Sequence, residues 1–206
     1  MKKKGFVIAG CIMLILLSTS AYGEEDRGYI NANFGLGFFS DSSATNQITP
    51  GLNYDIKANK GFAVGAAIGR DFYGFPRIEG EIAYQSNGLD KAVKGSRKVT
   101  LHEDIDSLAF LVNGYWDFKN HSFWTPYLSA GLGGALINVD DNSSYVGNDY
   151  AGVFAYQVGC GLAYAVDENL TIDIKYRYFA TSNPKFKFVE MEYATQNVYV
   201  GMRYSF

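Results

Sequence analysis

Cysteine is almost absent from this chain, with two residues among 206. So few cysteines exclude a disulfide scaffold and a cysteine-rich metal site. Proline is also scarce, at four residues, and no run of about 18 apolar residues follows the N-terminus, which excludes a bundle of membrane-spanning helices. Basic residues number 18 and acidic residues 21, so the chain lacks the positive excess expected of a nucleic-acid-binding protein.

Aromatic and glycine residues are the abundant classes. The chain has 15 Phe, 16 Tyr and 2 Trp, together with 23 Gly, and its apolar fraction of 48% is too high for a disordered chain. Aromatic side chains favour β-strands and the interface between water and lipid. The composition therefore indicates a folded, strand-rich chain.

The N-terminus has the pattern of an export signal. Basic residues 2–4 precede an apolar run over 5–17, and small residues follow up to Gly23. We predict a signal peptide over 1–23 and a mature domain over 24–206. A lipoprotein-like box ends at Cys11, but cleavage there would leave several apolar residues at the mature N-terminus, so lipidation is the less favoured alternative.

Apolar residues alternate with glycine, small or polar residues throughout the mature chain, and no apolar stripe of helical period occurs there. This period of two predicts eight β-strands. The alternating segments lie at residues 30–38, 62–69, 77–84, 107–116, 128–133, 154–164, 170–178 and 197–206.

Long and short connections between these segments follow each other in strict alternation. This layout predicts an all-β fold, an eight-stranded antiparallel up-and-down transmembrane β-barrel with short periplasmic turns and long extracellular loops. The predicted connections lie at about 40–58, 71–75, 86–104, 119–123, 140–151, 167–168 and 181–190.

The composition of the two strand faces indicates which one meets the lipid. A soluble lipid-binding barrel would turn its apolar face inward and its polar face to water. Here the second face is rich in Gly and Ala, which suit the crowded interior of a narrow barrel better than a water-exposed surface. We therefore predict that the apolar face points outward into lipid.

The last segment ends in alternating apolar residues and a terminal aromatic, which resembles the C-terminal signal read by the outer-membrane assembly machinery. The residues of this assembly signal are Val200, Met202, Tyr204 and Phe206. With the segments at 77–84, 125–133 and 172–178, it resembles the small bacterial outer-membrane β-barrel superfamily of opacity-type proteins, surface antigens and outer-membrane protein A barrels. The resemblance implies eight strands, a location in the bacterial outer membrane among lipid and lipopolysaccharide, and surface-exposed loops.

Catalytic and metal-binding patterns are weak. His121 and Ser122 are adjacent, so they would point to opposite sides of a strand, and they fall in a predicted periplasmic turn. His102 beside Glu103 and Asp104 is typical of solvated loop charge, and Cys160 falls on the apolar face. We predict no enzyme activity, no cofactor and no metal site.

Six charged residues fall on the predicted inner face and form a candidate lumen charge network. An eight-stranded barrel is just wide enough for side chains to fill, and unpaired charges there would be costly, so we predict that these groups pair and plug the lumen. The residues are Glu79, Glu81, Asp173, Lys175, Arg177 and Arg203.

Function is then expected in the extracellular loops. Lys91, Lys94, Arg97 and Lys98 form a candidate loop interaction patch for lipopolysaccharide phosphates or another surface ligand. We predict a structural and surface-interaction role of the adhesin or antigen type. The alternative is a narrow pore that passes small solutes or ions through the lumen.

Overall fold

A computed structural model provides the structure of the chain. It describes residues 27–39, 42–46, 53–72, 76–94, 97–139, 149–182, 189–191 and 193–206. The predicted signal peptide over 1–23 lies outside the described residues, so both its cleavage and the start of the mature domain stay predictions. The described residues contain no helix long and apolar enough to cross a membrane.

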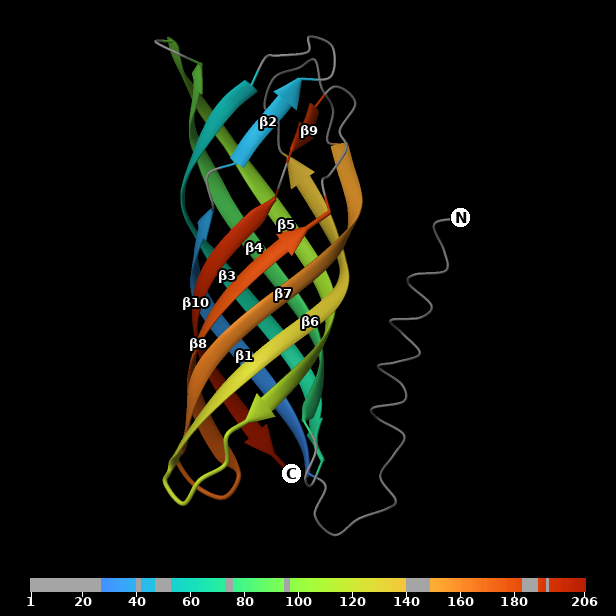
Figure 1. Ribbon diagram of the computed structural model, residues 1–206, viewed down its shortest axis with the longest axis vertical. Helices are drawn as coiled ribbons and strands as arrows, with labels where there is room; N and C mark the ends of the chain where they lie inside the picture. Colours follow the sequence, from blue (N-terminus) through green and yellow to red (C-terminus); the bar gives the residue numbers. More distant parts are fainter. Residues whose placement is uncertain are drawn as a thin grey trace.

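Ten strands, most of them long, make up the described fold (Figure 1). They are β1 (Arg27–Phe39), β2 (Ser42–Asn46), β3 (Asn53–Asp71), β4 (Arg77–Lys94), β5 (Arg97–Asp117), β6 (Trp124–Val139), β7 (Asp149–Ala165), β8 (Leu170–Thr181), β9 (Val189–Met191) and β10 (Ala194–Ser205).

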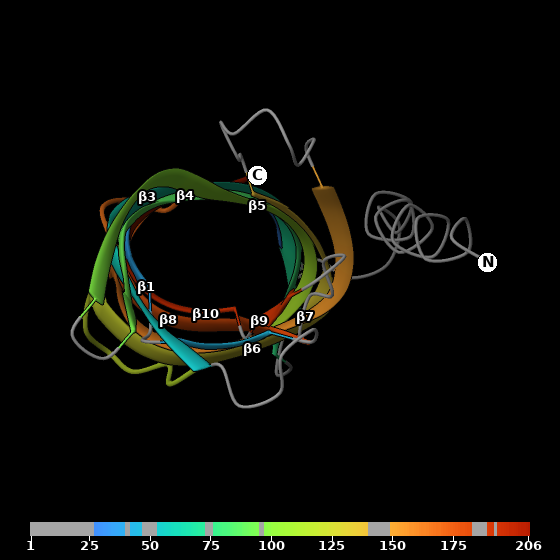
Figure 2. The ribbon, with the colours of Figure 1, turned by 90° about the horizontal axis from the view of Figure 1, so that it is seen from above.

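The strands close into a barrel, seen along its axis in Figure 2. Antiparallel pairing runs from β3 to β8 in sequence order, then to β10 and β1, and β1 closes the ring on β3. The short strands β2 and β9 pair with each other above β1 and β10. Eight strands thus form the closed wall of the barrel, which confirms the prediction of an eight-stranded antiparallel barrel.

The two faces of the wall are sorted as the alternation predicted. Large apolar side chains point outward, with Phe34 62% and Ile174 59% exposed, whereas Glu79 on the inner face is fully buried. In lipid this arrangement is favourable because apolar groups meet the hydrocarbon and every backbone group inside the closed wall finds a partner.

Exposed aromatic residues mark the two ends of the apolar band. Trp116, Trp124 and Phe206 lie near the end with the short turns, while Phe38 and Phe154 lie nearer the opposite end. Aromatic belts of this kind occupy the headgroup layers of a membrane. We assign the short-turn end to the periplasm and the opposite end to the cell exterior.

The predicted limits of two long connections are wrong. Residues 86–104 are mostly strand, because β4 and β5 stay paired up to Lys94 and Arg97, and β3 already begins at Asn53 within the predicted loop 40–58. These segments read as loops because they are polar. Outside the membrane, however, polar strands keep their backbone hydrogen bonds and need no apolar face. The β4–β5 hairpin consequently extends past the barrel at its outer end (Figure 1).

Candidate functional site in the barrel interior

The inner face of the barrel carries a dense set of charged groups. Glu79, Glu81, Lys175 and Arg177 are all buried, at 3% exposure or less. They come from β4 and β8, which lie on different parts of the wall and meet only across the lumen. Because eight strands leave little internal space, side chains from opposite walls touch.

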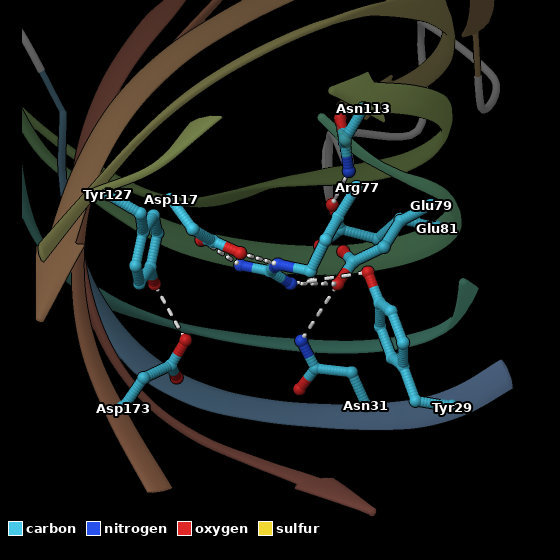
Figure 3. Close-up of polar contacts among 9 residues, drawn as sticks. All are labelled: Tyr29, Asn31, Arg77, Glu79, Glu81, Asn113, Asp117, Tyr127 and Asp173. Atoms are coloured by element: carbon cyan, nitrogen blue, oxygen red, sulfur yellow. Dashed lines mark hydrogen bonds and ion pairs between the residues drawn. The ribbon is translucent and has the colours of Figure 1, made fainter. Parts of the chain in front are cut away.

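Arg77 organises the periplasmic half of the interior (Figure 3). Its guanidinium donates two hydrogen bonds to Asp117, at 2.5 and 2.9 Å, and a third to the Tyr29 hydroxyl at 3.2 Å. The Glu79 carboxylate lies 3.6 Å from the same guanidinium. Asn31 donates a hydrogen bond to Glu79 at 3.4 Å. One arginine therefore links β1, β4 and β5.

Arg177 and Glu81 form the second ion pair, at the middle of the barrel. The guanidinium lies 2.6 Å from one Glu81 oxygen, and Asn113 donates to the other at 2.6 Å. Gln157 in turn donates to the Asn113 side-chain oxygen. This chain of contacts joins β8, β4, β5 and β7. Both carboxylate oxygens are satisfied, as a buried charge requires.

Tyrosine rings separate the cations of the lumen. Each contact below places a cationic group within 6 Å of a ring centroid, the range of a cation–π interaction. In order they are Arg203 with Tyr29 at 5.4 Å, Tyr29 with Arg77 at 5.6 Å, Arg77 with Tyr115 at 4.5 Å, Tyr115 with Lys175 at 5.9 Å, Lys175 with Tyr199 at 5.4 Å and Tyr199 with Arg177 at 4.7 Å. We call this series the cation–tyrosine ladder. It runs from the periplasmic end to the middle of the barrel and packs the space between the ion pairs.

The extracellular half of the interior is different in chemistry. Apolar side chains point inward from β5, β6 and β8, and Ile105, Ile137 and Phe179 pack together with Tyr193. Tyr193 also accepts a hydrogen bond from Asn87. Buried polar residues of the same inner face, among them Ser107, Thr181 and Thr195, surround this apolar cluster, so the extracellular half is filled by side chains of both kinds.

A protein-family profile described as outer membrane protein beta-barrel domain matches residues 9–206. The chain belongs to this family. It is 30% identical over 194 residues to outer membrane protein PagN of Salmonella typhimurium. The aligned region covers 82% of this chain and 81% of PagN. As an outer membrane β-barrel, it is a protein of the Gram-negative cell envelope.

Solved barrels share the fold of this family member. Neisserial surface protein A has a TM-score of 0.59 at 20% identity, covering 87% of this chain and 97% of that structure. OprG of Pseudomonas aeruginosa has a TM-score of 0.57 at 18% identity, covering 88% of this chain and 95% of that structure. These likenesses support the closed β-barrel.

Within this outer membrane β-barrel, the six candidate lumen residues have unequal environments. Glu79, Glu81 and Arg177 take part in ion pairs, and Asp173 accepts a hydrogen bond from Tyr127 at 2.6 Å. Arg203 has no ion pair in the described part of the chain and contacts the Tyr29 ring instead. The ammonium group of Lys175 has no hydrogen-bond partner among the described residues and lies against two tyrosine rings.

Sequence reasoning missed Arg77, Asp117 and the inward-facing tyrosines. The period of two places Arg77 on the same face as Glu79 and Glu81, which was the available signal. Asp117 ends β5 and could not be assigned to the interior from the pattern. Tyr29, Tyr115 and Tyr127 are buried, but tyrosine is also typical of the lipid interface, so composition alone does not separate the two roles.

The remaining candidates lie outside the lumen. His121 and Ser122 are exposed in the turn between β5 and β6, and Cys160 is exposed on the outer face. No group of three or more potential metal ligands occurs among the residues that the structure describes. The side chain of His102 lies outside the described part, as do those of Lys91, Lys94, Arg97 and Lys98.

Strand register gives the backbone positions of the four residues of the loop interaction patch. Lys94 lies opposite Arg97, Lys98 lies opposite Val93, and Lys91 lies opposite Lys57 of β3. Paired positions share one face of a sheet, and positions two apart in a strand share it too. Lys57, Lys91 and Lys98 therefore occupy one face of the protruding sheet, and Lys94 and Arg97 occupy the other. The side chains of the four candidates lie outside the described part of the structure, so the loop interaction patch stays a prediction.

Proposed function

We propose that this protein is a sealed membrane anchor that catalyses no reaction and presents the paired outer ends of β3, β4 and β5, here called the β3–β5 extension, for surface interactions. The observation that supports the sealed lumen is its filling: two buried ion pairs and the cation–tyrosine ladder in one half, and the apolar cluster around Phe179 in the other. Its surroundings would be outer-membrane lipid and lipopolysaccharide. The exposed alternation of Val200, Met202, Tyr204 and Phe206 supports recognition by the assembly machinery.

We expect the refolded barrel to be electrically silent in a planar lipid bilayer. The buried side chains that fill this narrow lumen should leave ions no water-filled path through it. The measurement is single-channel conductance, with folding checked by the heat-dependent shift in gel mobility. Discrete, reproducible steps from folded protein would overturn this prediction and favour the pore, with Glu79, Glu81, Lys175, Arg177 and Arg203 as the residues to test.

We further propose that the cations of the β3–β5 extension bind anionic groups such as lipopolysaccharide phosphates. A basic residue near an anionic surface contributes about 1 kcal/mol, so removing two charges from the binding face should weaken binding by about thirtyfold. The measurement is cosedimentation of nanodisc-embedded barrel with vesicles that contain lipopolysaccharide. We expect the Lys91→Gln/Lys98→Gln variant, whose face also carries Lys57, to lose more binding than the Lys94→Gln/Arg97→Gln variant.

The second variant is the matched control for the first, because both neutralise the same hairpin on different faces. Equal losses in the two variants would indicate diffuse attraction rather than one binding face. Unchanged binding in a variant that combines all four substitutions would exclude the patch altogether.

A further inference from the structure

A cavity of about 280 Å³ opens at the periplasmic end of the barrel. Its wall combines small residues, Thr125, Ala163, Ala165 and Thr171, with charged groups from the ends of several strands. The small side chains leave room for a ligand where bulkier residues would close the mouth. A volume near 300 Å³ is the lower limit for small-molecule sites, so only a small ligand fits.

One charged group that lines this cavity has no partner of opposite sign among the described residues. Asp117 is engaged by two hydrogen bonds from Arg77, and Asp71 lies 3.5 Å from the Lys119 ammonium. Each carboxylate therefore has its own cation. Arg203, on β10, also lines the cavity and has no ion pair in the described part of the chain. Among the described residues, the cavity thus contains one guanidinium without a counter-ion.

Neighbouring groups hold this guanidinium in place. Arg203 lies in register between Asn31 of β1 and Thr171 of β8, and its side chain stacks near the Tyr29 ring at 5.4 Å. An arginine that stacks on an aromatic ring keeps its N–H edge free for a planar acceptor. A carboxylate matches that edge with two parallel hydrogen bonds.

We propose that the periplasmic cavity binds a small ligand with a single carboxylate, such as the free C-terminal end of a short peptide. Arg203 donates two hydrogen bonds to the carboxylate. Thr171, which lines the same cavity, supplies a hydroxyl. A doubly charged phosphate fits less well because Arg203 alone among the described cations of the cavity has no carboxylate partner, so one of the two phosphate charges would stay uncompensated.

The test is an NMR titration of the isotope-labelled barrel in nanodiscs with N-acetyl-alanyl-alanine. We expect the backbone amide signals of Arg203, Thr171 and Ala163 to shift in a saturable manner. Arg203→Gln should weaken binding by about tenfold or more, because it removes both charge-assisted hydrogen bonds. The amidated peptide and inorganic phosphate should bind more weakly than the free acid.

Arg27→Gln is the matched control, because Arg27 also lies at the periplasmic end but donates to the Glu168 carbonyl instead of lining the cavity. Its binding should equal that of the unmodified protein. Equal binding of the amidated peptide, or full binding by Arg203→Gln, would overturn the proposal. An equal loss in both arginine variants would assign the effect to general charge and would overturn it as well.

Discussion

Replacing Arg177 with methionine should destabilise the barrel by about 3–5 kcal/mol, because it leaves the Glu81 carboxylate buried without a cation. Glu81 and Arg177 are 2.6 Å apart, and both side chains are almost fully buried. The measurement is the urea dependence of folding in lipid vesicles, followed by the fluorescence of Trp116 and Trp124. The stability lost is the difference in unfolding free energy from the unmodified protein.

The double variant Glu81→Gln/Arg177→Met shows how much of the lost unfolding free energy comes from burying an unpaired charge and how much comes from losing the ion pair. We expect it to regain much of the lost stability, since a neutral amide can still accept the hydrogen bond from Asn113. If the double variant loses as much stability as Arg177→Met and Glu81→Gln do together when each is measured alone, the residues act independently and their pairing contributes nothing to stability.

Replacing Gly161 with alanine should cost about 1–3 kcal/mol, since the new methyl group has no space. A Cβ at this position would lie 2.3 Å from the Tyr127 ring and 2.8 Å from the backbone oxygen of Ile174. The ring cannot move freely because its hydroxyl donates to Asp173 and its edge packs on Tyr115. The readout is the midpoint of urea unfolding in vesicles.

Gly114→Ala is the control for this substitution. Gly114 also lies in a membrane-spanning strand, but an added Cβ there meets nothing within 4 Å. We expect its unfolding midpoint to stay close to that of the unmodified protein. Similar losses in both variants would mean that the backbone freedom of glycine matters in these strands, rather than the space under the tyrosine ring.

The alternation of side chains predicted the membrane-spanning strands because lipid requires apolar residues on the outer face of each of them. Ile172 and Ile174 had to face outward, and Asp173 and Lys175 inward, whatever the neighbouring strands were. Partner choice inside the barrel depends instead on register and on contacts across the lumen. The pattern could suggest that Glu81 is buried, but not that it would meet Arg177 from β8 rather than Lys175.

The extracellular half was harder to predict for a second reason. Ile105, Ile137 and Phe179 are apolar residues on the inner face, so they depart from the polar-inside rule that identified the other lumen positions. The predicted β4 and β5 were too short because strands in water can carry polar residues on both faces and so lack the alternation of apolar and polar residues. Their strands are held by backbone pairing, which leaves little trace in the side-chain pattern.

The pairing of β1 with β10 also constrains how the protein is made. Tyr29 lies opposite Ser205, so the seam joins the first described strand to the last described one. Every partial chain that lacks β10 has two open edges, whose unpaired amides and carbonyls cannot enter lipid without a cost of several kcal/mol each. The chain must therefore stay in water, away from the membrane, until β10 is available, and products that lack β10 are excluded from the bilayer by their own backbone.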